Sequence, residues 1–345
     1  MFRSKNLRTS VAAAAALASL MTMAACTGAE KASDKGAASA PAKAGGGGGD
    51  GTYYWISQNS TLPLFVAHDH PAWNAAAEEL GVKAELVGPT TIDLAAFIST
   101  INQICAQKPA GVAVVGWDPS LTAAVNKCVE QGVPTVTDDA DLPDSKRLAF
   151  IGTDWCQIGV AQAKAMIEAT GGTGKIATLS IINADNMVDA RRCFESTLAD
   201  STLEIVAEED DGGDAAQAAS KTASLLAAYP DLVGIAGFDS ESGAGAVRAL
   251  TEAGKIGEVK VTAMEQTPEF FQTVKDGSVS AIIIQKRALF TYYALKTLYD
   301  YNNNGLSIGG LSRETTSTVP QFIDTGLVVA TKENIDEVLK AAKVS

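Results

Sequence analysis

The sequence is poor in histidine, in aromatic residues and in positive charge. Two of its 345 residues are histidine, His68 and His70, and aromatic residues make up 6% of the chain. A hydrolase that uses histidine also needs a nucleophile or a base, and a metalloenzyme needs further metal ligands. In both cases the spacing must bring these side chains together. His68 and His70 flank Asp69, but residues two apart diverge on a helix and no third ligand has motif spacing. We therefore expect no enzyme, no metal site and no cofactor.

Basic residues are too few for a partner that carries phosphates. Lys and Arg total 27 against 40 Asp and Glu, which gives a formal net charge of −13 and a pI near 4.7. Without a basic patch the chain cannot neutralise a nucleic-acid backbone, so nucleic acid is excluded. The run Gly171–Lys175 (GGTGK) lacks the earlier glycine and the following Ser or Thr of a phosphate loop, and it predicts a helix-to-strand turn.

No apolar run near the N-terminus reaches the ~20 residues that a membrane span requires. Arg3, Lys5 and Arg8 precede the short apolar run 11–21, which is typical of a secretory signal. The next residues, Met23-Ala-Ala-Cys26, resemble the bacterial lipobox, in which the cysteine is acylated. We predict a lipoprotein signal peptide over 1–25 and a location outside the cytoplasm, with the chain anchored to the cell membrane through Cys26. An ordinary signal peptide cleaved near residue 25 is the alternative.

Residues 26–51 lack aromatic residues and contain five consecutive glycines. Such a segment cannot bury enough apolar surface to fold, so we expect a flexible tether. The remainder, 52–345, is long enough for one large domain or two of medium size.

Cysteine is scarce but even in number once Cys26 is set aside. Cys105 and Cys128 fall on consecutive predicted helices, and so do Cys156 and Cys193. An exported chain is oxidised, so we predict the disulfides Cys105–Cys128 and Cys156–Cys193 among the three possible pairings. Four buried thiols are the alternative.

Short apolar runs rich in β-branched residues alternate with helical patterns along the folded part. The expected strands are 111–117, 133–139, 175–183, 203–210, 232–238 and 259–265. Runs that are apolar throughout, such as GVAVV at 111–115, suit strands covered on both faces. The pattern predicts an α/β fold with parallel sheets.

The chain reads as two similar halves. Gly116-Trp117-Asp118 ends one strand and Gly237-Phe238-Asp239 ends another about one domain later, and both open a helix. The strands that follow end in acids, Asp138-Asp139 in one half and Glu265 in the other. Because ligands sit beyond the carboxyl ends of parallel strands, two such sheets would present these residues to one cleft.

Three stretches together resemble the type I periplasmic sugar-binding proteins of ABC importers, the ribose, galactose and autoinducer-2 binding group. They are 133–154 (VPTVTDDADLPDSKRLAFIGTD), 259–268 (VKVTAMEQTP) and 322–334 (FIDTGLVVATKEN). The resemblance implies two Rossmann-like lobes joined by a three-segment hinge. We expect the first lobe to comprise 52–152 and 286–320 and the second 153–285 and 321–345, with crossings near 152–153, 285 and 318–322.

The resemblance also implies the ligand contacts. One lobe would contribute Gln58, Leu64, Phe65, Asp139 and Asp141, and the other lobe and the hinge Asp239, Glu265 and Gln285. Carboxylates accept hydrogen bonds from neighbouring hydroxyls, while aromatic faces cover the C–H surface of a sugar. The candidate aromatic walls are Phe65, Trp117, Trp155 and Phe238; core packing is the alternative for Phe65 and Phe238. Asp118 and Asp154 read as helix N-caps.

This sequence departs from the ribose-binding pattern at four positions. Alanines stand at Ala140 and Ala190 where that pattern has arginines, although Arg191 and Arg192 adjoin the second, and Leu62 and Leu64 replace an asparagine and a phenylalanine. The implied function is a monomeric binding protein that delivers a monosaccharide or a sugar alcohol to a membrane permease. A sensory receptor of the same fold, or a binder of a polar or cationic solute other than a carbohydrate, is the alternative. A repressor core shares the architecture but does not fit an exported chain.

Overall fold

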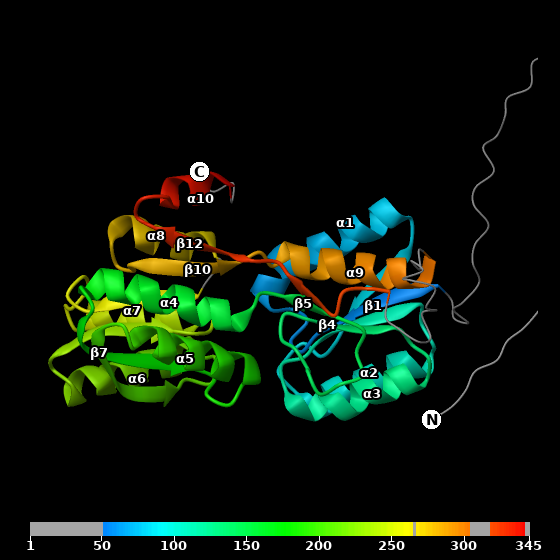
Figure 1. Cartoon of the computed structure of the whole chain (residues 1–345), viewed down its shortest axis with the longest axis horizontal. Coiled ribbons are helices and arrows are strands. Elements are labelled where there is room, and N and C mark those ends of the chain that lie inside the picture. Colours follow the sequence, from blue (N-terminus) through cyan, green and yellow to red (C-terminus); the bar gives the residue numbers. More distant parts are fainter. Residues whose placement is uncertain (1–50, 265–266, 304–317, 342–345) are drawn as a thin grey trace, which may run out of the picture. The chain divides into compact units, whose positions relative to one another are not determined.

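Two six-stranded sheets form the framework of a computed structural model that describes residues 51–264, 267–303 and 318–341 (Figure 1). The first sheet has the spatial order β2 (Lys83–Val87), β1 (Thr52–Ile56), β3 (Gly111–Val115), β4 (Thr135–Asp138), β5 (Phe150–Gly152) and β11 (Phe322–Asp324). The second has the order β7 (Thr202–Asp210), β6 (Thr173–Ser180), β8 (Leu232–Gly237), β9 (Lys260–Met264), β10 (Ala281–Gln285) and β12 (Leu327–Thr331).

The two sheets share one strand order and differ in the direction of the last strand. Every described pairing between these strands is parallel except that of β10 with β12, which is antiparallel. Strand β3 is buried at every residue, as expected for a strand covered on both faces. The predicted α/β class, the parallel sheets and the repeat of one half in the other are confirmed.

Helices cover both faces of the first sheet. On one face lie α1 (His70–Leu80) and α9 (Ala288–Asn303), and on the other lie α2 (Leu94–Ala106) and α3 (Thr122–Glu130) (Figure 1). The strand residues alternate between these layers: Trp55 and Ala113 pack toward the first pair of helices, Ile56 and Val114 toward the second. We call this sheet and its helices the first lobe.

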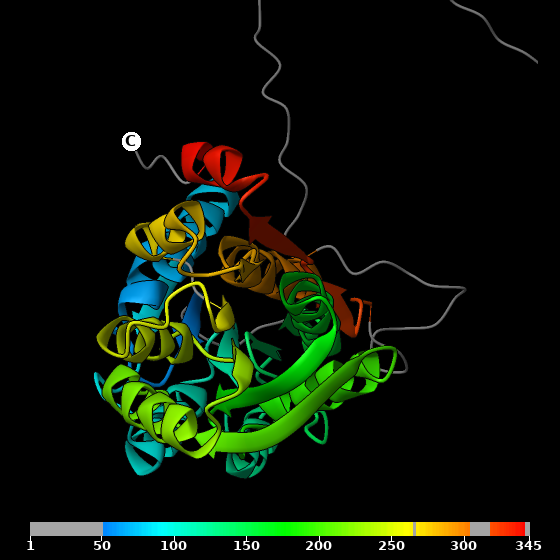
Figure 2. The same ribbon diagram turned by 90° about the vertical axis from the view of Figure 1, so that its left-hand side faces the viewer.

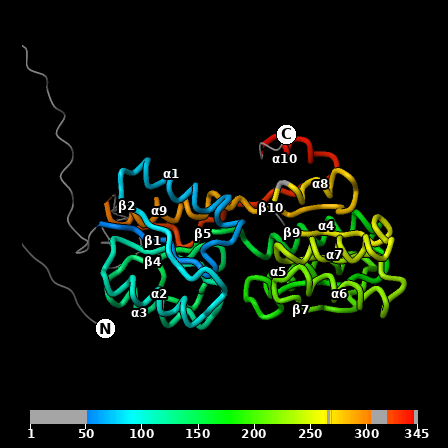
Figure 3. Tube along the Cα trace, turned by 180° about the vertical axis from the view of Figure 1, so that it is seen from behind, coloured from blue at the N-terminus to red at the C-terminus, as the bar shows by residue number. Residues whose placement is uncertain are grey.

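The second sheet is covered in the same way, and we call it and its helices the second lobe. One face carries α4 (Trp155–Thr170) and α5 (Asp185–Leu198), and the other carries α6 (Ala215–Ala228), α7 (Ser242–Glu252) and α8 (Pro268–Asp276). Helices α6 and α7 run side by side (Figure 3), and the C-terminal α10 (Ile335–Ala341) lies against α8 (Figure 2), where Lys275 pairs with Asp336 at 2.7 Å. None of the described helices is long and apolar enough to cross a bilayer.

Aspartate side chains begin several helices at the strand ends. Asp118 accepts a hydrogen bond from the Ser120 amide, and Asp154 accepts from the Cys156 and Gln157 amides at the start of α4. Both are the N-caps that the sequence predicts. At the other end of α4, Gly171 has φ +71, and the chain turns into β6, so the GGTGK run is a helix-to-strand turn.

Three chain segments cross between the sheets. The first follows β5 at Thr153 and the second follows β10 at Lys286, both close to the predicted crossings. The third was predicted at 318–322 and the prediction was wrong: β11 still pairs with β5, and the chain passes to β12 through Thr325 and Gly326. The aromatic stack of Phe150 on Phe322 and the bond from the Thr325 amide to the Gly152 carbonyl (2.8 Å) hold β11 in the first lobe.

The four described cysteines form the disulfides Cys105–Cys128 and Cys156–Cys193, the pairs predicted from their places on neighbouring helices. The second disulfide ties α4 to α5 where the two helices approach closely. A Cβ built on Gly159 would lie 1.9 Å from the Ala190 carbonyl oxygen, so only glycine permits this approach. The disulfide and the glycine together fix the helix pair that carries one wall of the site.

Candidate functional site

A pocket of about 380 Å³ is lined by residues at the carboxyl ends of strands from both sheets. The first lobe contributes Gln58 after β1, Trp117 after β3 and Asp139 after β4. The second lobe contributes Phe238 and Asp239 after β8 and Gln285 at the end of β10. This is the place where parallel sheets offer loops and helix starts to a ligand.

The structure brings most of the predicted site residues to this pocket. The lining residues among them are Gln58, Leu64, Phe65, Trp117, Asp139, Trp155, Asp239, Phe238 and Gln285. Phe65 and Phe238 are also core residues, because Phe65 packs edge-on against Trp55 and Phe238 packs edge-on against Phe194. Trp155 belongs to the second lobe, but its indole Nε1 donates to the Asp139 carbonyl of the first lobe at 3.1 Å. Glu265 lies outside the described residues, as does Cys26.

Four buried polar atoms at this pocket have no hydrogen-bond partner in the described structure. They are Gln58 Oε1, Trp117 Nε1, Asp239 Oδ2 and Gln285 Nε2. A buried polar atom without a partner costs free energy, roughly 1–3 kcal/mol, so such atoms are rare unless a ligand or water completes them. Two of the side chains offer N–H donors and two offer oxygen acceptors. A hydroxyl group can satisfy either kind, because it donates one bond and accepts others.

Arg287 is the site residue that the sequence analysis missed. It follows the second crossing, lines the pocket and is 3% exposed. Its guanidinium donates to both oxygens of Asp139 at 2.8 and 3.0 Å and to both oxygens of Asp69 at 3.1 and 3.2 Å. The guanidinium carbon lies 5.2 Å from the ring centres of Phe65 and Phe290. The sequence did contain a signal for this residue: an arginine stands two residues after Gln285, and several strand ends of the chain carry acids that need a cation.

The arginine compensates buried acids that would otherwise lack a cation. Burial raises the pKa of Asp69 to about 7, although Arg287 acts to lower it. Burial also raises the pKa of Asp138 well above its usual value, and its described polar contact is the bond from Trp55 Nε1 at 2.8 Å. Burial alone would lower the pKa of Arg287, but Asp139 and Asp69 raise it, so the guanidinium stays charged. The first-lobe wall therefore presents little net charge to the pocket.

A second group of acids lies at the start of α7. Asp239 Oδ1 accepts from the Glu241 and Ser242 amides at 2.9 and 2.8 Å, while Asp211 Oδ2 accepts from the Ser242 hydroxyl at 2.6 Å. Burial, and then the negative charge of the nearby Asp211, raise the pKa of Asp239 to about 7. Near neutral pH the Asp239 carboxyl is therefore protonated in a large part of the molecules.

Asp141 was predicted to contact the ligand, and the structure contradicts this prediction. Its carboxylate forms a bidentate ion pair with Arg147 and accepts from the Thr137 hydroxyl at 2.7 Å. It is absent from the described pocket lining, because the turn after Asp139 directs residue 141 toward the strand of Thr137 instead. Asp139 itself has φ +64, a left-handed conformation that makes this turn.

Neither arginine beside Ala190 lines this pocket. Arg191 donates to Glu208, to the Ser180 hydroxyl and to the Ile182 carbonyl, and Arg192 pairs with Asp189.

His70 packs its ring edge-on against Trp55 at 5.5 Å. Across the described ranges, no group of three or more His, Cys, Asp and Glu side chains is arranged to hold a metal ion.

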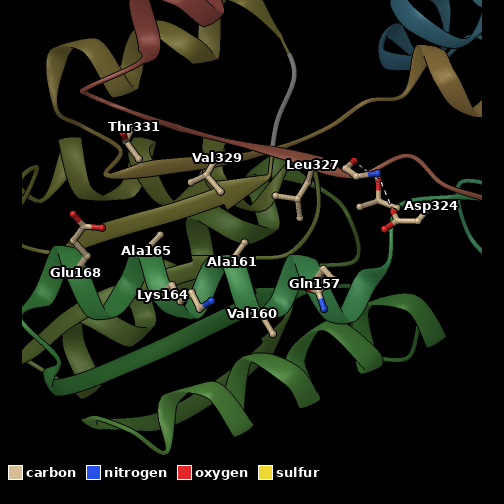
Figure 4. A pocket seen from close by; sticks show the side chains of 12 residues that line it. Gln157, Val160, Ala161, Lys164, Ala165, Glu168, Asp324, Leu327, Val329 and Thr331 are labelled. Carbon is tan, nitrogen blue, oxygen red and sulfur yellow. Dashed lines mark hydrogen bonds between the residues drawn. The ribbon is translucent and has the colours of Figure 1, made fainter.

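A second hollow of about 490 Å³ lies between α4 and β12, beside the first and third crossings. In Figure 4, Leu327 and Val329 of β12 lie opposite Ala161 and Ala165 of α4. Its Asp324 carboxylate accepts from the Asp154 and Gly326 amides, and none of its described lining residues carries a buried side-chain polar atom without a partner. Although this hollow is larger, the pocket with the unpartnered polar atoms is the better candidate for a ligand site.

Comparisons with known proteins agree with this architecture. A family model described as a periplasmic binding protein domain matches residues 53–305. A sugar-binding protein of a sugar ABC transporter from Bacillus halodurans superposes with a TM-score of 0.76 at 29% identity, covering 83% of this chain and 99% of the other. The arabinose-binding protein AraP from Geobacillus stearothermophilus gives a TM-score of 0.73 at 28% identity, covering 84% and 99%.

Curated relatives match over a shorter length. The ribose import binding protein of Salmonella typhimurium is 25% identical over 180 residues, which are 51% of this chain and 60% of that protein. The chain thus spans about 60% of that relative, and the match does not carry over what the whole protein binds. The family model, in contrast, extends over both lobes and the pocket between them. The chain belongs to the periplasmic binding protein domain family.

Proposed function

We propose that this protein is an extracytoplasmic solute-binding protein of an ABC importer and that it binds a monosaccharide or a sugar alcohol. The observation that carries the proposal is the set of four unpartnered polar atoms, on Gln58, Trp117, Asp239 and Gln285, beside aromatic side chains. Two of these atoms are donors and two are acceptors, which suits hydroxyl groups because a hydroxyl both donates and accepts. Aromatic faces such as that of Trp155 suit the C–H face of a sugar.

The charge balance favours a neutral ligand over a cationic one. Arg287 bonds both oxygens of Asp139, and burial raises the pKa of Asp239 to about 7, so this carboxyl is partly protonated near neutral pH. A site for a polyamine or an amino acid would gain from free carboxylates at these positions. The sugar relatives described above, one of them named for arabinose, agree with the same class of ligand.

Closure of the lobes over the ligand would supply the signal to a permease. The crossings at Thr153, Lys286 and Thr325–Gly326 are short, and hinges of this kind absorb domain rotation in a few residues. The Trp155 indole already bonds the Asp139 carbonyl across the lobes, so ligand and hinge contacts lie side by side. A ligand that binds the closed form better shifts the population toward it. In this function the protein acts as a monomer without a catalytic step.

A thermal-shift screen of the purified protein tests the ligand class. The panel contains pentoses, hexoses, their alditols, amino acids and polyamines. Ligand at about 1,000 times its Kd stabilises the native state by about 4 kcal/mol, which raises the Tm by several degrees. A rise confined to sugars or alditols supports the proposal. A rise only with cationic compounds would overturn it.

Two substitutions then test the pocket with the sugar or alditol of the largest shift. Asp239→Ala and Gln285→Ala each remove a polar group that bonds the ligand, so affinity should fall at least tenfold. The matched control is Asp118→Ala, which removes the equivalent strand-end aspartate outside the described pocket lining. Unchanged affinity in both pocket variants would show that the ligand binds elsewhere.

We also propose that Cys26 is acylated and holds the protein at the membrane through the tether 26–51. The supporting sequence is the Met23–Cys26 lipobox after a short apolar run. Replacing Cys26 with Ser should move the protein from the membrane fraction to the soluble fraction of cells. A protein that stays with the membrane would contradict the anchor.

A further inference from the structure

The pocket lining includes buried polar groups, which we call the polar floor, and partly exposed aliphatic side chains, which we call the apolar mouth. At the floor, Gln285 is 5% exposed and Asp239 is 6% exposed. At the mouth, Ile92 is 64% exposed and Leu64 is partly exposed. The buried lining also includes Phe65, Phe238 and Ile283, and the partly exposed lining also includes Asn186 and Glu241. The part of a ligand nearest the opening therefore meets aliphatic side chains beside polar ones.

We define the apolar mouth as Leu62, Leu64 and Ile92 of the first lobe with Ile181 and Ala184 of the second. All five are at least partly exposed; Leu64 lies in the first helical turn after β1, and the other four lie on loops between a strand and the next helix. Exposed aliphatic side chains scattered singly need no explanation, but a group around one opening indicates a binding surface.

The loops of the mouth are held in place by specific bonds. In the first lobe, the Ser60 amide donates to the Pro89 carbonyl at 2.7 Å and the Ser60 hydroxyl to the Gly88 carbonyl at 3.2 Å, which joins the loop of Leu62 to that of Ile92. In the second lobe, the Ile182 amide donates to Asp210 at 3.3 Å and the Ala184 amide to the Ile181 carbonyl at 3.1 Å. The mouth is thus a defined surface, with aliphatic groups fixed on both sides of the opening.

We propose that the ligand carries a short apolar group, an alkyl or aryl substituent on a sugar or polyol, which lies against the apolar mouth. This inference rests on the proposed function, because the hydroxyl-bearing part of the ligand bonds the polar floor. The volume of about 380 Å³ is within the range of pockets that hold drug-sized ligands, which leaves room for such a substituent.

Matched pairs of a free sugar and its glycosides test this inference. The probes are D-glucose, D-galactose and D-arabinose with their methyl and n-propyl glycosides in both anomeric forms, titrated by calorimetry. Each methylene buried against the mouth should tighten binding about fourfold, so a propyl glycoside should bind about fifteenfold more tightly than the methyl glycoside. Free sugars that bind as tightly as their propyl glycosides, or more tightly, would overturn the inference while the proposed function stands. If no sugar and no glycoside binds, both fail.

Variants distinguish a ligand subsite from a pair of apolar surfaces that contact each other when the lobes close. Ile92→Ser and Leu64→Ser should lower the ratio of propyl to methyl affinity toward one. The control Val66→Ser changes a residue that is 50% exposed in the same segment and outside the described lining, and it should keep the wild-type ratio. A fall in both affinities at an unchanged ratio would mean that the mouth residues contact each other, and would overturn the subsite.

Discussion

The raised pKa of the buried Asp239 leads to a stability that depends on pH, and Asp239→Asn tests it. Asparagine keeps an oxygen for the Glu241 and Ser242 amides and replaces the second oxygen by an amide that needs no proton. A carboxyl with a higher pKa in the folded than in the unfolded chain releases its proton on unfolding between the two pKa values. Its contribution to stability is complete below the unfolded pKa and is lost as the pH rises through the folded pKa.

The structure gives the size of this effect. A pKa of about 7 in place of 3.8 corresponds to about 4 kcal/mol of unfolding free energy, lost between pH 4 and 7. The unfolding free energy of the wild type should therefore fall relative to that of Asp239→Asn over this range, by up to about 4 kcal/mol, and stay level above it. Urea unfolding followed by tryptophan fluorescence at pH 4 to 8.5 measures the difference.

The matched control is Asp118→Asn, an aspartate cap at the equivalent strand end whose described partners are the Ser120 amide and hydroxyl. It tests whether an aspartate cap without a second carboxyl behaves in the same way. Parallel pH profiles for the wild type and Asp239→Asn would refute the reasoning, because folding would then not raise the pKa of Asp239.

Three further predictions concern the contacts that fix the site. Arg287→Met should lower the unfolding free energy by about 3–5 kcal/mol because it leaves Asp69 buried without a cation, whereas Lys296→Met, at a bridge open to solvent, should cost much less; urea titrations of equal cost would contradict this. Replacing Cys156 and Cys193 together by serine should cost about 3–4 kcal/mol through the loop that their disulfide closes, and an unchanged Tm would show that the disulfide contributes nothing. Gly159→Ala should cost about 1–3 kcal/mol, because a Cβ there overlaps the Ala190 carbonyl, and a fully stable variant would show that α4 and α5 can separate.

Local patterns in the sequence were enough to predict six of the twelve described strands and the repetition of the two halves. Apolar runs such as 111–115 predict buried strands, and an aspartate after a strand, such as Asp154, predicts a cap, because both depend on neighbours in the chain. The disulfides were predictable for a related reason: the helices of Cys105 and Cys128 follow each other along the chain and pack on one face of the sheet. Acids at strand ends such as Asp239 could be placed at the pocket because parallel sheets bring all these ends to one edge, whereas Gln58 was predicted from the family resemblance.

Contacts between distant segments could be decided only by the tertiary structure. The third crossing was misplaced because β11 has three residues, too few for a pattern, and its lobe is set by pairing with β5. Arg287 was missed because its partner Asp69 lies 218 residues earlier in the chain. Asp141 was assigned to the ligand site, but its carboxylate forms an ion pair with Arg147. Sequence spacing determines which side chains reach the strand ends. Which of those charges pair with each other, and which polar atoms stay free for a ligand, depends on packing between segments that no local pattern records.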